Sequence, residues 1–245
     1  MAGRRTGGNG TVEVVGVIVA STQLTWYLTR SAGFVALILL TASVALGVLA
    51  MARFRTTVWP RFVTQTLHRN VSLLALALLF AHVATTVLDG YVPIGWLDAL
   101  IPFRSSYRTL WLGLGAIAVD LMLAIIITSL LRRHIGYRGW QAVHLTSWLA
   151  WPLAILHGLG TGSDSQHGWA QLVYIVCAAA VLVACWARLA IGWPDHAGTR
   201  VLAGAASVVV ALLVTAWALS GPLQSGWAQR ADAPVAPAIQ SGVVQ

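Results

Sequence analysis

Four histidines lie in two pairs within long apolar segments of the chain. His68 and His82 share one segment, and His144 and His157 share another. Coordinating side chains at membrane depth are costly and rare, so each raises the hypothesis of a functional site. On a helix, the two pairs would span about 21 Å and about 19.5 Å along the axis. Because imidazole is an axial ligand of haem iron, this spacing indicates ligands for two stacked b-type haems.

The composition excludes an ordinary soluble protein. Of the 245 residues, 58% are hydrophobic and only 9% are charged, whereas soluble domains carry about 25% charged residues. All fifteen basic residues are arginines. They cluster between apolar runs, where they set the orientation of membrane spans. We therefore predict an integral membrane protein in contact with the lipid bilayer, and no nucleic-acid partner.

Six apolar runs are long enough, at roughly 20 residues each, to cross a bilayer as helices. The sequence therefore predicts an all-α, polytopic transmembrane helix bundle with about six spans. The runs lie near residues 31–51, 67–89, 109–131, 140–160, 169–191 and 201–220. Residues 12–28 form a weaker candidate that includes Glu13, Thr22 and Gln23, so this segment is either an interfacial helix or an extra span.

The arginines predict how the spans are oriented. With six spans, nine arginines share one side, which the positive-inside rule assigns to the cytoplasm. These are Arg53, Arg55, Arg61, Arg69, Arg132, Arg133, Arg138, Arg188 and Arg200. The other six face outward, with the N-terminus: Arg4, Arg5, Arg30, Arg104, Arg108 and Arg230. An extra span at residues 12–28 would bring Arg4 and Arg5 inside. We predict a multi-pass protein of the plasma membrane, of the kind found in the bacterial inner membrane.

This orientation pairs the histidines by depth. His68 and His144 lie near the expected cytoplasmic face, and His82 and His157 lie near the outer face. Two histidines at one depth on neighbouring helices can ligate one iron from both sides, which would hold the haems between the second and fourth spans. On an ideal helix, however, His144 and His157 point about 140° apart. We expect a kink at Pro152 to re-aim His157.

Other interpretations of these residues remain open. A histidine in a membrane helix also serves as an interhelical hydrogen-bonding contact. Zinc is less suitable, because it needs three or four ligands that converge on one point. Arginine forks match carboxylates, so Arg69 and Arg132, with Arg133 and Arg138, are candidates for the propionates of the inner haem. Arg104 and Arg108 are candidates for the outer haem or an anionic substrate. Topology and lipid headgroups are the alternative role for each arginine.

The connecting segments carry weaker signals. Trp96, Leu97, Leu100 and Ile101 predict a short interfacial helix in the outer loop 90–108. The loop histidines, His134, His167 and His196, are expected to be solvated or interfacial. Residues 221–245 are rich in Ala, Pro, Gln and Ser and are expected to form a disordered extracytoplasmic tail.

Three segments of the chain resemble the ferric reductase-like transmembrane domain family, over roughly residues 26–190. They are Trp26-Tyr27-Leu28-Thr29-Arg30-Ser31-Ala32-Gly33, Leu67-His68-Arg69 with His82, and the stretch from Leu130-Leu131-Arg132-Arg133 through Trp140-Gln141-Ala142-Val143-His144 to Leu156-His157-Gly158. The family includes the membrane cores of NADPH oxidases, ferric reductases, and the haem subunit of a bacterial periplasmic methionine sulfoxide reductase. The paired histidine spacing is the specific part of this resemblance.

The resemblance implies a membrane b-type cytochrome with two haems. His68 with His144 would hold the inner haem, and His82 with His157 the outer one. Electrons would pass from a cytoplasmic or quinol donor to an extracytoplasmic acceptor or partner subunit. The oxidases carry a flavin and NADPH domain after the membrane core, whereas this sequence shows no flavin or nicotinamide site. The donor would therefore be a separate flavoprotein or a membrane quinol. The rival class is a non-redox membrane protein, either a transporter or an assembly scaffold.

These expectations divide the chain into four parts. Residues 1–28 form the N-terminal segment, 29–191 the haem-binding transmembrane domain, 192–220 an additional span, and 221–245 the tail.

Overall fold

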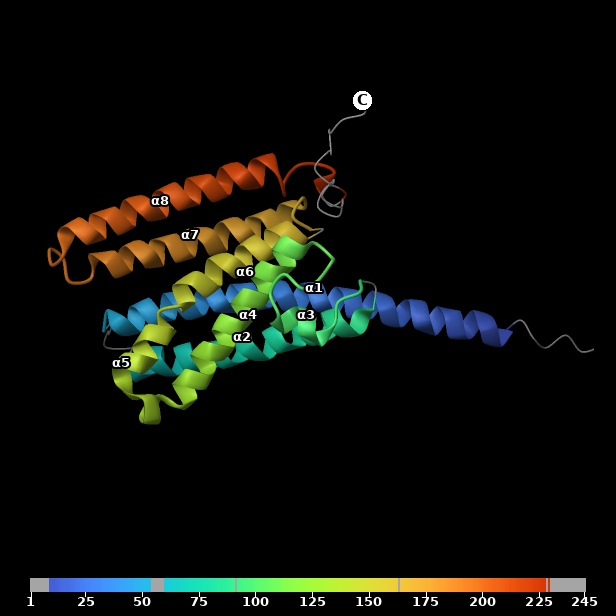
Figure 1. Cartoon of the computed structure of the whole chain (residues 1–245), viewed down its shortest axis with the longest axis horizontal. Coiled ribbons are helices and arrows are strands. Elements are labelled where there is room, and N and C mark those ends of the chain that lie inside the picture. The colour runs from blue at the N-terminus through green and yellow to red at the C-terminus, as the bar shows by residue number, and fades with distance from the viewer. Residues whose placement is uncertain (1–8, 54–59, 91, 163, 228, 230–245) are drawn as a thin grey trace, which may run out of the picture. The chain divides into compact units, whose positions relative to one another are not determined.

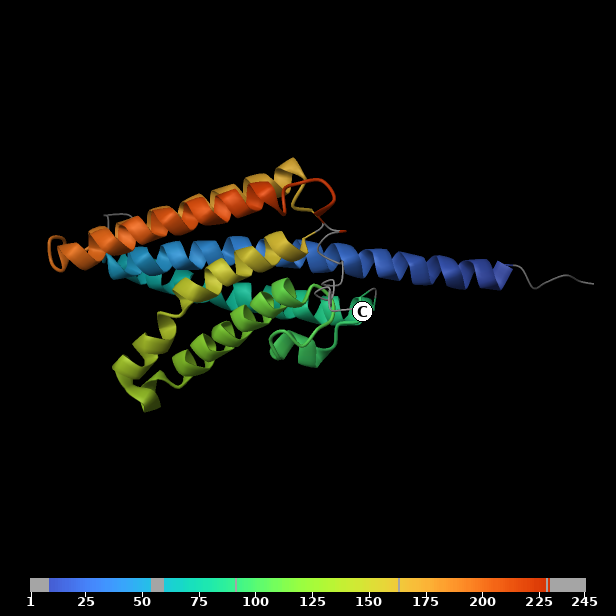
Figure 2. The same cartoon turned by 45° about the horizontal axis from the view of Figure 1, so that its top comes forward.

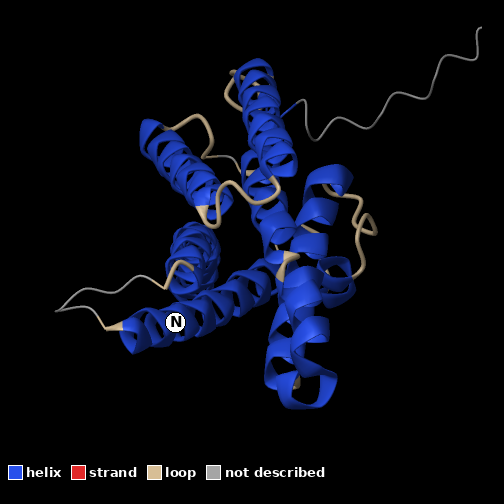
Figure 3. Cartoon of the chain, turned by 90° about the vertical axis from the view of Figure 1, so that its left-hand side faces the viewer, coloured by secondary structure: helices blue, strands red, loops and turns tan. Residues whose placement is uncertain are grey.

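The computed structural model of the chain consists of helices joined by loops, with no strand among the residues that it describes (Figure 3). It describes residues 9–53, 60–90, 92–162, 164–227 and 229, and side chains from residue 23 onward except at position 61. The predictions for Arg4, Arg5, Arg55, Arg230 and the tail beyond residue 229 lie outside these residues. The chain divides into two compact units, Met1–Ala99 and Leu100–Gln245.

The first unit is an antiparallel pair of long helices, α1 (Asn9–Met51) and α2 (Arg61–Asp89), which pack side by side (Figure 1). Polar side chains join the two helices at two levels. The Thr25 hydroxyl donates to the Asp89 carboxylate, and the Ser43 and Ser72 hydroxyls lie 2.6 Å apart. These contacts fix which turns of α1 lie opposite which turns of α2.

Helix α1 has 43 residues, which corresponds to about 65 Å of length, while the hydrocarbon core of a bilayer is about 30 Å thick. Its membrane-competent part is Gln23–Met51. Residues 12–28 are continuous with this part, without an intervening turn.

The second unit contains the remaining long helices. They are α4 (Thr109–Leu130), α5 (Arg132–His144), α6 (Ser147–Thr161), α7 (Gly168–Ala190) and α8 (Ala197–Ser220). Helix α4 packs against α6 and also contacts α5, while α7 and α8 form a hairpin (Figures 1 and 2). The short helix α3 (Trp96–Leu100) confirms the helix expected in the loop, and Trp96, Leu97 and Leu100 are exposed on it.

Among the residues that the structure describes, five helices are long and apolar enough to cross a membrane, and they match five of the six expected spans. Their large apolar side chains remain exposed, as at Phe80, Leu130 and Leu212. In water such a surface would be unfavourable, whereas in a bilayer it contacts lipid. The polytopic helical fold is therefore confirmed.

The prediction of one continuous span over residues 140–160 is wrong. The helix breaks at Leu145 and Thr146, between α5 and α6. The Thr146 hydroxyl donates to the Val143 carbonyl over 2.7 Å, and the Thr146 backbone N–H points to the same carbonyl. Such local side-chain bonds compete with the α-helical pattern. Helix α5 itself is interrupted at Gly136, whose φ of +74° suits glycine.

Candidate functional site

The two histidines of the first unit are held in the same way. The Nδ1 atom of His68 lies 2.9 Å from the Ser43 carbonyl oxygen, and that of His82 lies 2.8 Å from the Thr29 carbonyl oxygen. A carbonyl only accepts hydrogen bonds, so Nδ1 must carry the proton in both rings. The Nε2 atom then carries the lone pair, which is the form in which imidazole ligates a metal.

Glycines on α1 make room for both imidazole rings. A Cβ at Gly33 would lie 3.0 Å from Nδ1 of His82, and a Cβ at Gly47 would lie 3.4 Å from Cε1 of His68. Each glycine follows the accepting residue, Thr29 or Ser43, by four positions. A Cβ at Gly33 would therefore press on the imidazole ring that the Thr29 carbonyl holds, and a Cβ at Gly47 would just touch the ring that the Ser43 carbonyl holds.

The same fourteen-residue spacing therefore occurs on both helices of the first unit. It separates the two accepting residues and the two glycines on α1, and the two histidines on α2. Since the helices are antiparallel, the set of one accepting carbonyl, one glycine and one histidine is repeated about 21 Å further along the helix pair. The glycine spacing was a signal in the sequence that the analysis of the histidines alone missed.

His157 of the second unit repeats this arrangement against α4. Its Nδ1 atom lies 2.9 Å from the Trp111 carbonyl oxygen. Four residues beyond Trp111, a Cβ at Gly115 would lie only 2.4 Å from the same nitrogen. His157 is therefore the same metal-binding tautomer as His68 and His82. Its ring also lies closer to its glycine than theirs do.

His144 is positioned differently, by an aromatic stack at the end of α5. Its ring lies 4.8 Å from the Trp140 ring at an interplanar angle of 26°. The Trp140 indole N–H donates to the Ser129 hydroxyl over 3.2 Å, and the Arg132 guanidinium lies 4.3 Å from the Trp140 ring centroid. The sequence analysis named Trp140 only within the family resemblance and did not predict its stack on His144, although a spacing of four residues places both on one helix face.

The break at residues 145–146 also changes the angle expected between the His144 and His157 side chains. The expected 140° divergence assumed one ideal helix, whereas His144 ends α5 and His157 lies on α6. A kink was expected at Pro152, which lies inside α6, whereas the helix break lies earlier, at Leu145 and Thr146. The relative direction of the two rings is therefore set by a helix junction.

Aromatic and polar contacts surround the turn of α6 that follows His157. Trp111, Trp217 and Trp227 form a cluster, with Trp111 4.9 Å from Trp217 and 5.9 Å from Trp227 between ring centroids. The Trp227 indole N–H donates to the Gly160 carbonyl over 3.1 Å. A Cβ at Gly160 would lie 2.2 Å from the Trp111 ring, so only glycine allows α6 to approach this cluster.

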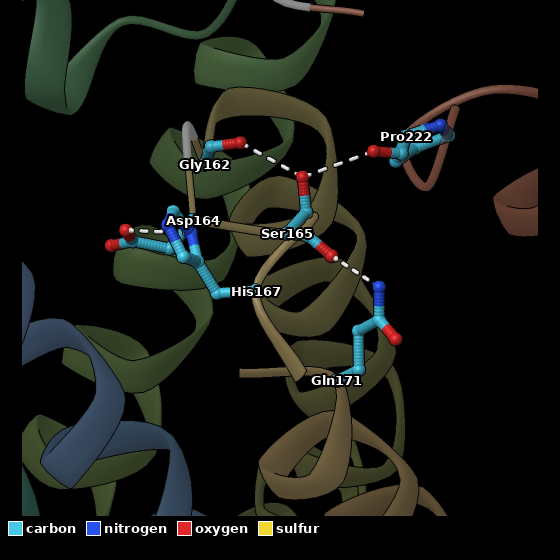
Figure 4. A network of polar contacts seen from close by, with 6 residues as sticks. All are labelled: Gly162, Asp164, Ser165, His167, Gln171 and Pro222. Atoms are coloured by element: carbon cyan, nitrogen blue, oxygen red, sulfur yellow. Dashed lines mark hydrogen bonds and ion pairs between the residues drawn. The ribbon is translucent and has the colours of Figure 1, made fainter. Parts of the chain in front are cut away.

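The loop after α6 is closed by a buried serine (Figure 4). The Ser165 hydroxyl lies 3.0 Å from the Gly162 carbonyl oxygen and 3.1 Å from that of Pro222, and the Gln171 amide donates to the Ser165 carbonyl. His167 lies 3.6 Å from the Asp164 carboxylate. His134, His167 and His196 are exposed, as expected, although His134 lies within α5 and not in a loop.

The candidate arginines occupy different environments. Arg69, Arg104 and Arg132 are exposed, as are Arg133 and Arg138. Arg108 is buried, and its guanidinium donates to the Thr161 carbonyl over 2.7 Å at the end of α6. Arg108 therefore caps the C-terminal end of α6 by a hydrogen bond to its last carbonyl.

Among the described residues, no three side chains of His, Cys, Asp or Glu converge as a metal-binding group. In the first unit, His68 and His82 lie fourteen residues apart on α2, which is about 21 Å along the axis, so each offers one imidazole by itself. This arrangement fits a cofactor that takes one imidazole on each side of its iron, since each ring needs only an oriented Nε2 atom.

Comparison with known proteins identifies one family. A family model described as the ferric reductase like transmembrane component matches residues 32–161, more than half of the chain. The matched region contains all four histidines. No curated protein and no solved structure matches the chain.

Proposed function

Because the chain belongs to the ferric reductase-like transmembrane component family, we propose that it is a membrane b-type cytochrome. In this proposal it transfers electrons across the bilayer from a cytoplasmic or quinol donor to an extracytoplasmic acceptor. The observation that carries the proposal is the repeated anchoring of His68, His82 and His157 by carbonyl oxygens of a neighbouring helix.

We propose two bis-histidine haem sites. His68 with His144 ligates the inner haem, and His82 with His157 ligates the outer one. Bound between two imidazoles, a b-type haem takes up and gives back one electron at its iron. The pairing is supported by the matched depths along the sequence and by the tautomer that the carbonyl contacts select.

The chain's own residues have three tasks in this proposal. The α1 and α4 carbonyls hold three imidazoles in a fixed orientation, and Trp140 stacks against the fourth. The apolar spans exclude water and ions from the path. Arg69 and Arg132 would bind the inner propionates and Arg104 the outer ones, because guanidinium pairs well with carboxylate.

The partners and location follow from the predicted orientation. We propose a separate flavoprotein or a quinol as the donor, and an extracytoplasmic protein or partner subunit as the acceptor. The arginine distribution supports a plasma-membrane location, in a bacterium the inner membrane. His68, His82, His144 and His157 would hold the haems, which would supply one-electron transfer to the acceptor or partner subunit.

Purified full-length protein tests this function directly. It is reconstituted into vesicles that contain ferricyanide, and dithionite is added outside. The proposal predicts b-type absorption bands, two haems per chain, and reduction of the trapped ferricyanide well above that in empty vesicles. His82→Ala should retain the fold and lose transfer. A folded, colourless wild-type protein would contradict the proposal and favour a transporter or scaffold.

A further inference from the structure

An open apolar groove of about 450 Å³ lies between the end of α7 and the start of α8. Its walls include the indoles of Trp186 and Trp193, and Gly204 of α8 also lines it. The other lining residues are aliphatic except for Arg200. Neither the family match, which ends at residue 161, nor the histidine sites account for this groove.

Arg200 is fixed in place at the groove. Its guanidinium donates to the Leu189 carbonyl over 2.6 Å and also to the Ile191 carbonyl. These carbonyls belong to the end of α7, where the last turn of a helix leaves carbonyls without intrahelical donors. The guanidinium remains charged at any physiological pH and has five N–H donors, so it can bind an anion without moving from this position.

The walls of the groove are similarly ordered. The Trp186 indole N–H donates to the Ser207 hydroxyl over 3.1 Å. A Cβ at Gly204 would lie 3.7 Å from the Leu189 side chain, an ordinary contact distance. The glycine therefore leaves space for an alkyl chain along α8, and a larger side chain could fill that space without displacing the backbone.

The groove lies at the membrane-boundary end of its hairpin. It adjoins the loop 192–196 between two membrane-competent helices, and this end of the second unit also holds α5 with its exposed arginines (Figures 1 and 2). Tryptophan and arginine are both favoured at such interfaces. In the expected orientation this is the cytoplasmic side, where anionic lipids attract basic residues.

We propose that this groove binds one phospholipid with an anionic headgroup, its phosphate against Arg200 and an acyl chain between α7 and α8. The fixed cation at one end of an apolar groove matches this amphipathic molecule in both charge and polarity. A quinol is a poorer match, because none of the lining side chains is a carboxylate or imidazole that could accept its protons. The proposal does not depend on haem binding.

Native mass spectrometry of the full-length protein tests the proposal, after exchange into equal mixtures of phosphatidylglycerol and phosphatidylcholine. We expect one phosphatidylglycerol to be retained preferentially. Arg200→Gln should weaken this preference about fivefold, as loss of one basic contact with an anionic lipid implies. Gly204→Leu keeps the charge and fills the groove, and should remove the retained lipid of either kind. Far-UV circular dichroism establishes that each variant is folded.

Arg188→Gln is the matched control, since Arg188 lies in the last turn of α7 but does not line the groove. It should leave the retained lipid unchanged. Equal losses in Arg188→Gln and Arg200→Gln would overturn the proposal in favour of general surface charge. Wild-type protein without a preference between the two lipids, or Gly204→Leu with undiminished retention, would also overturn it.

Discussion

The two units position their histidines by different means. In the first unit, both imidazoles point to carbonyls of one straight neighbouring helix, and the geometry at His68 recurs at His82 fourteen residues later. In the second unit, only His157 has the same carbonyl and glycine arrangement, while His144 ends a separate helix and stacks on Trp140. The first unit therefore holds both of its histidines by the same carbonyl contact. The second unit holds His157 by such a contact and His144 by a ring stack at a helix junction.

This difference has a physical consequence for ligand order. A hydrogen bond to a carbonyl within a helix fixes both the tautomer and the ring orientation. Ring stacking is worth only about 0.5 to 1.5 kcal/mol and leaves more freedom. If each proposed haem takes one ligand from each unit, the inner haem has one carbonyl-anchored ligand and one stacked ligand, and the outer haem has two anchored ligands.

The largest effect that separates the two units is expected from Gly115→Ala. The new Cβ would lie 2.4 Å from Nδ1 of His157, so the ring must move and lose its bond to Trp111. We expect about one haem per chain to be lost, measured by the pyridine haemochrome spectrum. Gly168→Ala, where a Cβ meets nothing within 4 Å, is the control and should retain all haem. Full haem content in Gly115→Ala would show that this contact does not position a ligand.

The glycines of the first unit should give a graded, smaller effect. A Cβ at Gly33 would lie 3.0 Å from His82, and one at Gly47 would lie 3.4 Å from His68. Overpacking costs about 1 to 3 kcal/mol, so Gly33→Ala should reduce haem retention strongly and Gly47→Ala less strongly. Retention during dilution into apomyoglobin measures both. The reverse order would contradict the role assigned to these contacts.

The smallest effect is expected at Trp140. Trp140→Leu removes the stack on His144, which at about 0.5 to 1.5 kcal/mol corresponds to roughly two- to tenfold weaker haem retention. Trp140→Phe preserves an aromatic face and should lie close to wild type. The same apomyoglobin assay reads both variants. If Leu and Phe behave identically, the stack does not order His144.

Much of this architecture was readable from the sequence because its main signals are local. Apolar runs of about 20 residues predicted the helical fold and six spans, five of which match membrane-competent helices among the described residues. The apolar run that begins at Trp96 predicted α3. The resemblance to the family was also correct. The assignment of the four histidines to haem remains a prediction, as does the division of the chain into domains.

The features that were missed depend on contacts between elements. The break at Thr146 comes from a side-chain bond that competes with the helix, in a run whose hydropathy is continuous. Gly115 acquires its role only once α4 lies against His157. No single-segment pattern carries that information, although the shared spacing of Gly33 and Gly47 with the histidines could have indicated it for the first unit.

The haem content of double histidine variants reports which histidines share one haem. His68→Ala with His144→Ala removes both ligands of one proposed site and should leave one haem per chain. His68→Ala with His157→Ala removes one ligand from each site and should leave none. Pyridine haemochrome spectra of the folded double variants should show this difference. Equal haem content in the two double variants would contradict it.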